Sequence, residues 1–138
     1  MKILVPVHLL LDPSGFVVNR RAGRVFVNRE DYITNPADRC ALEAALQIRD
    51  STGAEIVAVT VGPARNETAL REALALGAVE AMRVDAPELD EAAQALVLAR
   101  LALRLGGVEL VLTGSAAADS GWSSTPARTR ASTRRTRA

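Results

Sequence analysis

The sequence predicts an α/β fold in which a doubly wound, mostly parallel sheet carries helices on both faces. Short segments rich in Val, Ile and Leu alternate along the chain with longer helical patterns, and this alternation is typical of parallel strands joined by right-handed crossovers. The composition agrees, since 49% of the residues are apolar and only 3% are aromatic. The core must therefore consist of Ala, Val, Leu and Ile. A length of 138 residues suits one domain.

The N-terminal part of the sequence predicts one strand, followed by a segment that leaves the sheet. Residues Lys2–Val7 form a continuous apolar run, which favours a buried parallel strand. The segments Phe16–Val18 and Arg24–Val27 flank a polar turn. They predict a β-hairpin that leaves the sheet after the first strand.

The first predicted helix has a clear beginning. Asn35 is a typical N-cap, and Pro36 suits the first helical position, where its missing N–H has no cost. We expect this helix to end near Gly53. Cys40, close to its start, is expected to be a small buried side chain rather than a reactive thiol.

The remaining residues continue the alternation of strands and helices. The second helix ends before Gly77, a natural C′ residue, and Leu70, Ala73 and Leu74 are expected to share one face of it. The later strands are predicted at Glu55–Val61, Glu80–Val84 and Val108–Leu112, the last of them as a core strand. The later helices are predicted at Asn66–Leu76 and Leu89–Leu105.

A ligand site is expected at the carboxyl ends of these strands. Open sheets of this kind bind ligands there, near the change in strand order. The relevant ends are residues 6–9, 61–63 and 113–125. The Gly-Pro turn at Gly62 leads into a helix, and the unpaired N–H groups and the dipole of a first helical turn favour a phosphate.

Three segments, in this order, resemble the beta subunit of electron transfer flavoproteins. Met1-Lys-Ile-Leu-Val-Pro-Val7 resembles the family's K-I-L-V-A-V-K, with Pro6 in place of the usual Ala. The eleven residues from Asn35 to Ala45 resemble N-P-[FA]-[DC]-x-x-A-[VL]-E-A-A. Residues 62–78 resemble G-P followed by E-T-[LI]-R-x-A-L-A-[ML]-G-A, with Ala69 inserted. The resemblance covers about residues 1–122, the first half or so of a typical member, and implies an adenine-nucleotide alpha-hydrolase-like fold.

The resemblance also implies a function. Members form a heterodimer in which a larger alpha subunit holds FAD, while the beta subunit binds AMP and docks dehydrogenases. The chain would then be an electron-carrier subunit and not an enzyme by itself. Its expected partners are the alpha subunit and dehydrogenases or ferredoxin, and no nucleic acid. AMP, or a flavin in its place, would lie against Pro6, Asn35, Pro36, Ala37, Asp38, Val61, Gly114, Ser115, Ala116, Ala117, Ala118, Asp119 and Thr125.

Several of these residues also have a plain structural interpretation. Asn35 caps a helix whether or not it binds a ligand. Asp119 is either a ribose contact or a solvated turn residue. His8 stands where the family usually has Lys, so its position suggests a phosphate or redox role, although a lone His is more often packed or solvent-facing. Glu67 and Glu72 are expected to be solubilising charges on a helix surface.

The C-terminal residues depart from the family pattern. The loop after the last strand matches through Asp119, but Ser124 replaces the family's Gln and Pro126 its Gly. Residues 123–138 lack apolar periodicity, so we expect a disordered basic tail beyond a domain of residues 1–122. Our hypothesis is a non-native ending, such as a frameshifted or truncated reading. The alternative is a tail that binds nucleic acid or another anionic surface through its arginines.

Two other functions remain open. One is a stand-alone adenine-nucleotide-binding module of the universal-stress-protein type, although the glycine-rich phosphate loop of those proteins is missing after Leu112; the other is an inactive fragment. The sequence has no P-loop, G-x-G-x-x-G or G-x-S-x-G motif, and one His and one Cys exclude multi-His and thiolate metal sites. The apolar run near the start is too short to span a bilayer and lacks a signal-peptide pattern, so we expect a cytoplasmic protein.

Overall fold

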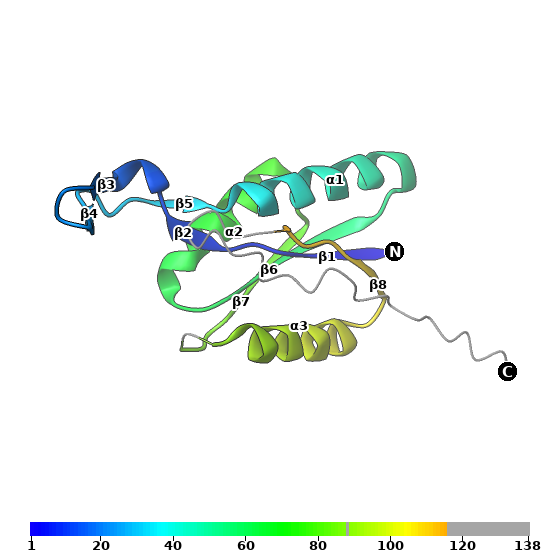
Figure 1. The fold of residues 1–138 in the computed structure, drawn as a ribbon. Helices are drawn as coiled ribbons and strands as arrows, with labels where there is room; N and C mark the ends of the chain where they lie inside the picture. Colours follow the sequence, from blue (N-terminus) through cyan, green and yellow to red (C-terminus); the bar gives the residue numbers. More distant parts are fainter. Residues whose placement is uncertain (88, 116–138) are drawn as a thin grey trace, which may run out of the picture.

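A four-stranded parallel sheet is the centre of the structure, a computed structural model that describes residues 1–87 and 89–115 (Figure 1). The strands lie in the order β7-β6-β1-β8. The predicted doubly wound α/β fold is confirmed. The strands are β1 (Lys2–Pro6), β6 (Glu55–Val61), β7 (Glu80–Val84) and β8 (Val108–Val111).

Both faces of the sheet are covered by helices. Helices α1 (Pro36–Thr52) and α2 (Glu67–Leu76) lie on one face, and α3 (Glu91–Leu105) lies on the other (Figure 1). Because successive residues of a strand point to opposite faces, Ile3 and Val5 pack with α1 and α2, while Leu4 packs toward α3. Alanines on α1 and α2 (Ala41, Ala45, Ala69 and Ala73) belong to the first of these cores.

The helix ends follow the capping rules, but the predicted start of the third helix needs a correction. The Asn35 side chain accepts a hydrogen bond from the Ala37 N–H at 3.4 Å, and Gly53 ends α1 in the left-handed conformation. The third helix begins at Glu91 and not at Leu89 as predicted, because Asp90 is its N-cap and accepts a 2.7 Å hydrogen bond from the Ala93 N–H.

The excursion after β1 is longer than predicted. Its hairpin, β3 (Phe16–Asn19) with β4 (Arg24–Val27), confirms the prediction. The sequence did not predict the second antiparallel pair, β2 (Leu9–Leu11) with β5 (Tyr32–Thr34). A strand of only three residues is too short to show an alternation of apolar and polar side chains. A short 3-10 turn, Pro13–Gly15, links β2 to the hairpin.

Two expectations about burial were wrong, those for Cys40 and for the last predicted strand. Cys40 is exposed, because the buried residues of α1, which include Ala41, Leu42 and Ala45, lie on the opposite side of the helix. Leu74 is 44% exposed, at the margin of the apolar stripe that buries Leu70 and Ala73. Strand β8, expected in the core, is an edge strand of the described sheet with alternating partial exposure.

Within residues 1–87 and 89–115, none of the three helices has both the length and the apolar character needed to cross a membrane.

Candidate functional site

The candidate site lies where the order of the strands changes direction. From β1 the chain moves outward to β6 and β7, and it then returns through α3 to the other side of β1 as β8. At such a switch the segments leaving two neighbouring strands go to opposite faces, and ligands bind beyond their carboxyl ends. The segments that follow β1 and β8 therefore form the candidate site.

The N-terminus of α1 is attached to the end of β1. Pro6 is buried, and the next residue, Val7, donates a 2.8 Å backbone hydrogen bond to Val59. The His8 carbonyl accepts a 2.9 Å bond from the Asn35 N–H. Asn35 is 4% exposed, whereas Pro36 faces solvent. The first turn of α1 is thus held directly beside the carboxyl end of β1.

Asp38 and His8 form the charged pair at this junction. Asp38 is 3% exposed, and its Oδ2 atom accepts a 2.9 Å hydrogen bond from the His8 backbone N–H. The same oxygen lies 3.0 Å from His8 Nδ1. A carboxylate in the first turn of a helix is also favoured by the helix dipole. Asp38 therefore fixes both the backbone and the ring of His8.

The pair changes the protonation of the imidazole. Burial by itself lowers the pKa of His8, but the hydrogen bond and negative charge of Asp38, with a smaller contribution from Gln94 on α3, outweigh burial and raise the pKa above its ordinary value of 6.5. Asp38 and Gln94 come from helices on opposite faces of the sheet. Groups at the beginnings of both helices thus influence the pKa of His8.

The His8–Asp38 pair is expected to make stability depend on pH. Because the folded pKa of His8 lies above the unfolded one, the stabilisation is complete below about pH 6.5 and is lost as the pH rises through the folded pKa. The side chain is 38% exposed, so solvent screening limits the effect to about 1 kcal/mol or less. Urea unfolding of the natural chain and of His8→Gln, between about pH 5.5 and pH 8.5, measures this contribution to the free energy of unfolding. A difference in stability that does not shrink with rising pH would contradict this assignment.

Gly114 brings the segment after β8 against the same turn of α1. A Cβ atom on Gly114 would lie 2.8 Å from both the Ala37 carbonyl carbon and the Asp38 backbone nitrogen, and it would also meet Asp38 Oδ1. Real Cβ atoms do not approach other atoms this closely, so only glycine permits this approach without a shift of the backbone. The next residue, Ser115, is exposed.

Val61 ends the neighbouring strand β6 and is 8% exposed. Gly62 follows with φ of 143°, and a Cβ atom there would lie 2.7 Å from Asn66 Nδ2. That amide is 3.3 Å from Thr60 Oγ1, so Asn66 makes no side-chain cap at the start of α2. Because β6 pairs with β1 in parallel, Val61 lies at the same edge of the sheet as the His8–Asp38 pair, one strand away from it.

Glu72 supports the first turn of α1 from α2, which corrects its expected role as a solubilising charge. Its carboxylate accepts a 2.5 Å hydrogen bond from Thr34 Oγ1 and lies 2.7 Å from Arg39 Nε. Burial raises the pKa of Glu72, but the hydrogen bonds from Thr34 and Arg39 and the charge of Arg39 outweigh burial and lower it. Sequence spacing gave no signal of these contacts, since Thr34 and Glu72 are 38 positions apart.

The structure brings together part of the predicted set. Pro6, the turn from Asn35 to Asp38 and Gly114 converge at the switch point, and Val61 lies at the next strand. Ala116, Ala117, Ala118, Asp119 and Thr125 lie outside the described residues. Gln94 was missed as a member of this cluster, whereas the position of His8 beyond the first strand had suggested a phosphate or redox role. The signal for His8 was its place immediately beyond a buried strand.

A hollow between α1 and α2, lined by residues such as Arg39, Cys40 and Glu43, includes none of the predicted site residues. In the part of the chain that the structure describes, no group of three or more His, Cys, Asp or Glu is arranged to hold a metal ion.

The strand order and the position of this cluster define an open, doubly wound α/β protein with its candidate ligand site at the topological switch point. The model of the electron transfer flavoprotein domain matches residues 23–131. The chain belongs to the electron transfer flavoprotein family, and several of its curated relatives are beta subunits.

Curated relatives agree with this assignment. The chain is 35% identical over 123 residues to the caffeyl-CoA reductase-Etf complex subunit CarD of Acetobacterium woodii, covering 86% of this chain and 47% of the relative. It is 34% identical over 130 residues to an electron transfer flavoprotein subunit beta of Syntrophomonas wolfei, covering 93% and 51%. The corresponding subunit of Thermoanaerobacterium thermosaccharolyticum is 51% identical over 81 residues, covering 59% and 31%. The chain thus spans between about a third and a half of these relatives.

Proposed function

We propose that this chain is a beta-type electron-transfer subunit that binds AMP and associates with an alpha subunit carrying FAD. The family match supports the electron-transfer role. The convergence of the β1 end, the first turn of α1 and Gly114 at the switch point is the single observation that supports the nucleotide site. We further propose that the chain is not an enzyme by itself, that dehydrogenases or ferredoxin exchange electrons with the complex, and that the protein is cytoplasmic.

The residues of this chain would bind and orient the nucleotide. The positive end of the α1 dipole favours an anionic group at Asn35–Asp38, and the close approach of Gly114 would let the segment after β8 cover a ligand held there. Val61 would offer backbone groups at the neighbouring strand. FAD on the partner would supply the redox chemistry, so the role of this chain is structural support of the carrier.

Isothermal titration of the 138-residue chain with AMP, ATP and FAD tests the nucleotide site. We expect AMP to bind, and a chain that ends after Trp122 to bind it with similar affinity, because the described cluster lies before that residue. Preference for ATP would favour the stand-alone nucleotide-binding module. FAD binding at the same site would assign the position to a flavin, and no binding of any of the three would contradict the proposal.

A further inference from the structure

The turn that follows β6 is held from the neighbouring strand β7. Gly62, the first residue after β6, donates its backbone N–H to the Val84 carbonyl at 3.0 Å. The Gly62 carbonyl accepts a 3.1 Å hydrogen bond from Nη1 of Arg83. Both polar groups of the Gly62 backbone are therefore bound by residues of β7.

Two carboxylates fix the guanidinium group of Arg83. Its Nε atom lies 3.1 Å from Oε1 of Glu67, the first residue of α2, and its Nη1 atom lies 2.7 Å from Oδ1 of Asp85, just beyond β7. The side chain of Arg83 is only 23% exposed. Because a guanidinium offers several N–H groups in a rigid fork, this one side chain joins β7, the turn after β6 and the beginning of α2.

The backbone of this turn needs a restraint of that kind. The φ of Gly62 is 143°, and glycine has more accessible backbone conformations than any other residue, so its own preferences do not hold it there. The Asn66 side chain also lies close, but its Nδ2 atom is 3.5 Å from the Val61 carbonyl oxygen, at the limit of a hydrogen bond. The bond from Arg83 to the Gly62 carbonyl is the shorter of these two.

The direction of the Val61 N–H depends on the same turn. Backbone polar groups of successive strand residues point alternately to the two neighbouring strands. Gly62 bonds toward β7, whereas Val59 accepts a 2.8 Å hydrogen bond from the Val7 N–H on the β1 side. Val61 follows Val59 by two residues, so its N–H also points to the β1 side. The pairing of β1 with β6 ends at Pro6 and Val59, and the Val61 N–H thus lies past the end of β1, beside the candidate site.

We propose that Arg83 is a positioning residue for nucleotide binding: by fixing the turn at Gly62, it keeps the Val61 N–H directed into the proposed AMP site. This inference rests on the proposed function, because it takes AMP as the ligand. Arg83 acts through the backbone and does not itself touch the nucleotide. A donor that is already in place binds a ligand more tightly, because no entropy is lost in ordering the turn when the ligand arrives.

Isothermal titration of the 138-residue chain with AMP and with adenosine tests this role. Arg83→Met removes the donors and keeps an unbranched apolar side chain. We expect it to weaken the binding of AMP and of adenosine alike, by about fivefold or more, because the displaced donor belongs to the backbone and does not depend on the phosphate. Arg83→Lys keeps the charge but lacks the fork that reaches Gly62 and Glu67 together, so we expect a smaller loss of about threefold.

Arg71→Met is the matched control. Arg71 is 78% exposed and lies 3.7 Å from the carboxylate of Glu67, the same carboxylate that Arg83 binds. The change therefore removes a positive charge from this cluster and leaves the bond to Gly62 in place. It should bind AMP within about twofold of the natural chain. Urea unfolding of each variant separates a local change from a loss of the fold.

Hydrogen exchange measures the restraint itself. In the absence of AMP, the Gly62 amide of Arg83→Met should exchange about fivefold faster than in the natural chain, because the turn opens more often. The same amide in Arg71→Met should exchange at the natural rate. Should Arg83→Met fail to fold, Arg83→Lys takes its place, with a twofold change in AMP affinity as the limit.

Four outcomes would overturn the positioning role. A folded Arg83→Met that binds AMP within about twofold of the natural chain would contradict it and leave the AMP site standing. A loss confined to AMP, with adenosine unaffected, would make Arg83 a direct phosphate contact. An equal loss in Arg71→Met would assign the effect to the net charge of the cluster. If the natural chain binds no AMP, the positioning role and the proposed nucleotide site both fail.

Discussion

Replacement of Asp38 by Ala is expected to lower the free energy of unfolding by about 2–3 kcal/mol. Asp38 is 3% exposed and accepts the His8 backbone N–H at 2.9 Å. Without the carboxylate, that buried N–H loses its partner, and the His8 ring loses the group that orients it. The variant also removes a negative charge from the first turn of α1, where the helix dipole favours it.

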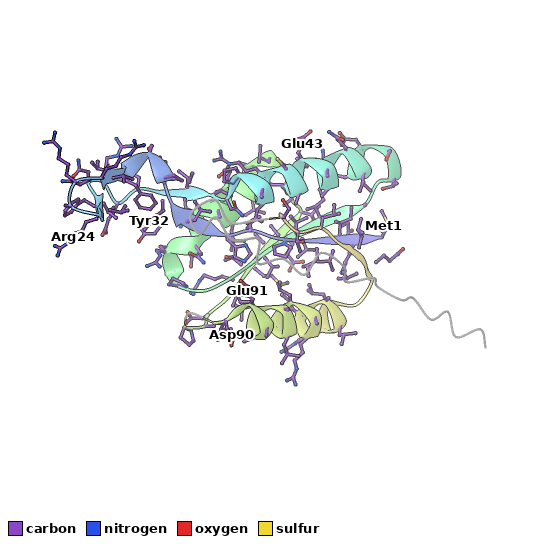
Figure 2. All side chains as sticks on the ribbon, viewed as in Figure 1. Met1, Arg24, Tyr32, Glu43, Asp90 and Glu91 are labelled. Atoms are coloured by element: carbon purple, nitrogen blue, oxygen red, sulfur yellow. The ribbon has the colours of Figure 1, made fainter. Side chains whose placement is uncertain are left out.

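Urea unfolding at neutral pH measures the loss, and the AMP titration measures its effect on the site. Asp38→Asn retains an oxygen acceptor without the charge, so we expect it to lower the free energy of unfolding by less than Asp38→Ala does. Glu43→Ala is the matched control, because Glu43 is an exposed carboxylate on the same helix (Figure 2). A loss no larger than that of Glu43→Ala would show that Asp38 does not hold this junction.

Replacement of Gly114 by Val is expected to reduce AMP affinity by about tenfold or more. A Cβ atom at Gly114 would lie 2.8 Å from backbone atoms of Ala37 and Asp38, so the two segments must separate. Gly114 is only half-buried. We therefore expect stability to fall by only about 1 kcal/mol, while the change at Gly114 distorts the proposed ligand site.

Titration with AMP and urea unfolding of the same samples distinguish these effects. Val111→Ala is a suitable control, because Val111 is 44% exposed on β8 and a smaller side chain there meets no new contact. If Gly114→Val binds AMP as the natural chain does, the segment after β8 does not contribute to the proposed site.

The main elements of the fold could be predicted because each has a local cause. The apolar run of β1, the Asn35-Pro36 start of α1 and the glycine that ends α2 are all readable from neighbouring residues. The β2–β5 pair could not be predicted in the same way, because two three-residue strands carry no periodic pattern. The exposure of Cys40 follows from the side of α1 that meets the sheet, which its mixed apolar pattern did not define.

The site was predictable only in part, for a related reason. The segments at the strand ends follow from the topology, and the family resemblance indicated which residues to examine. The contacts between them join residues far apart in the chain. His8 meets Asp38 thirty positions later, and Glu72 holds Thr34 and Arg39 from another helix. A single sequence carries no signal for such pairings, and the segment with Asp119 and Thr125 remains a prediction.

The central position of β1 has a consequence for the order of assembly during synthesis. Lys2 pairs with Glu55 on one side, and Ile3 pairs with Leu110 on the other. Strand β1 therefore acquires its second neighbour only after β8 has emerged from the ribosome. Closing such long loops is slow because the entropy is lost before the contacts form. Until then, one edge of an apolar strand stays open to pairing with other chains, so the nascent protein is most vulnerable to aggregation before its last described strand is made.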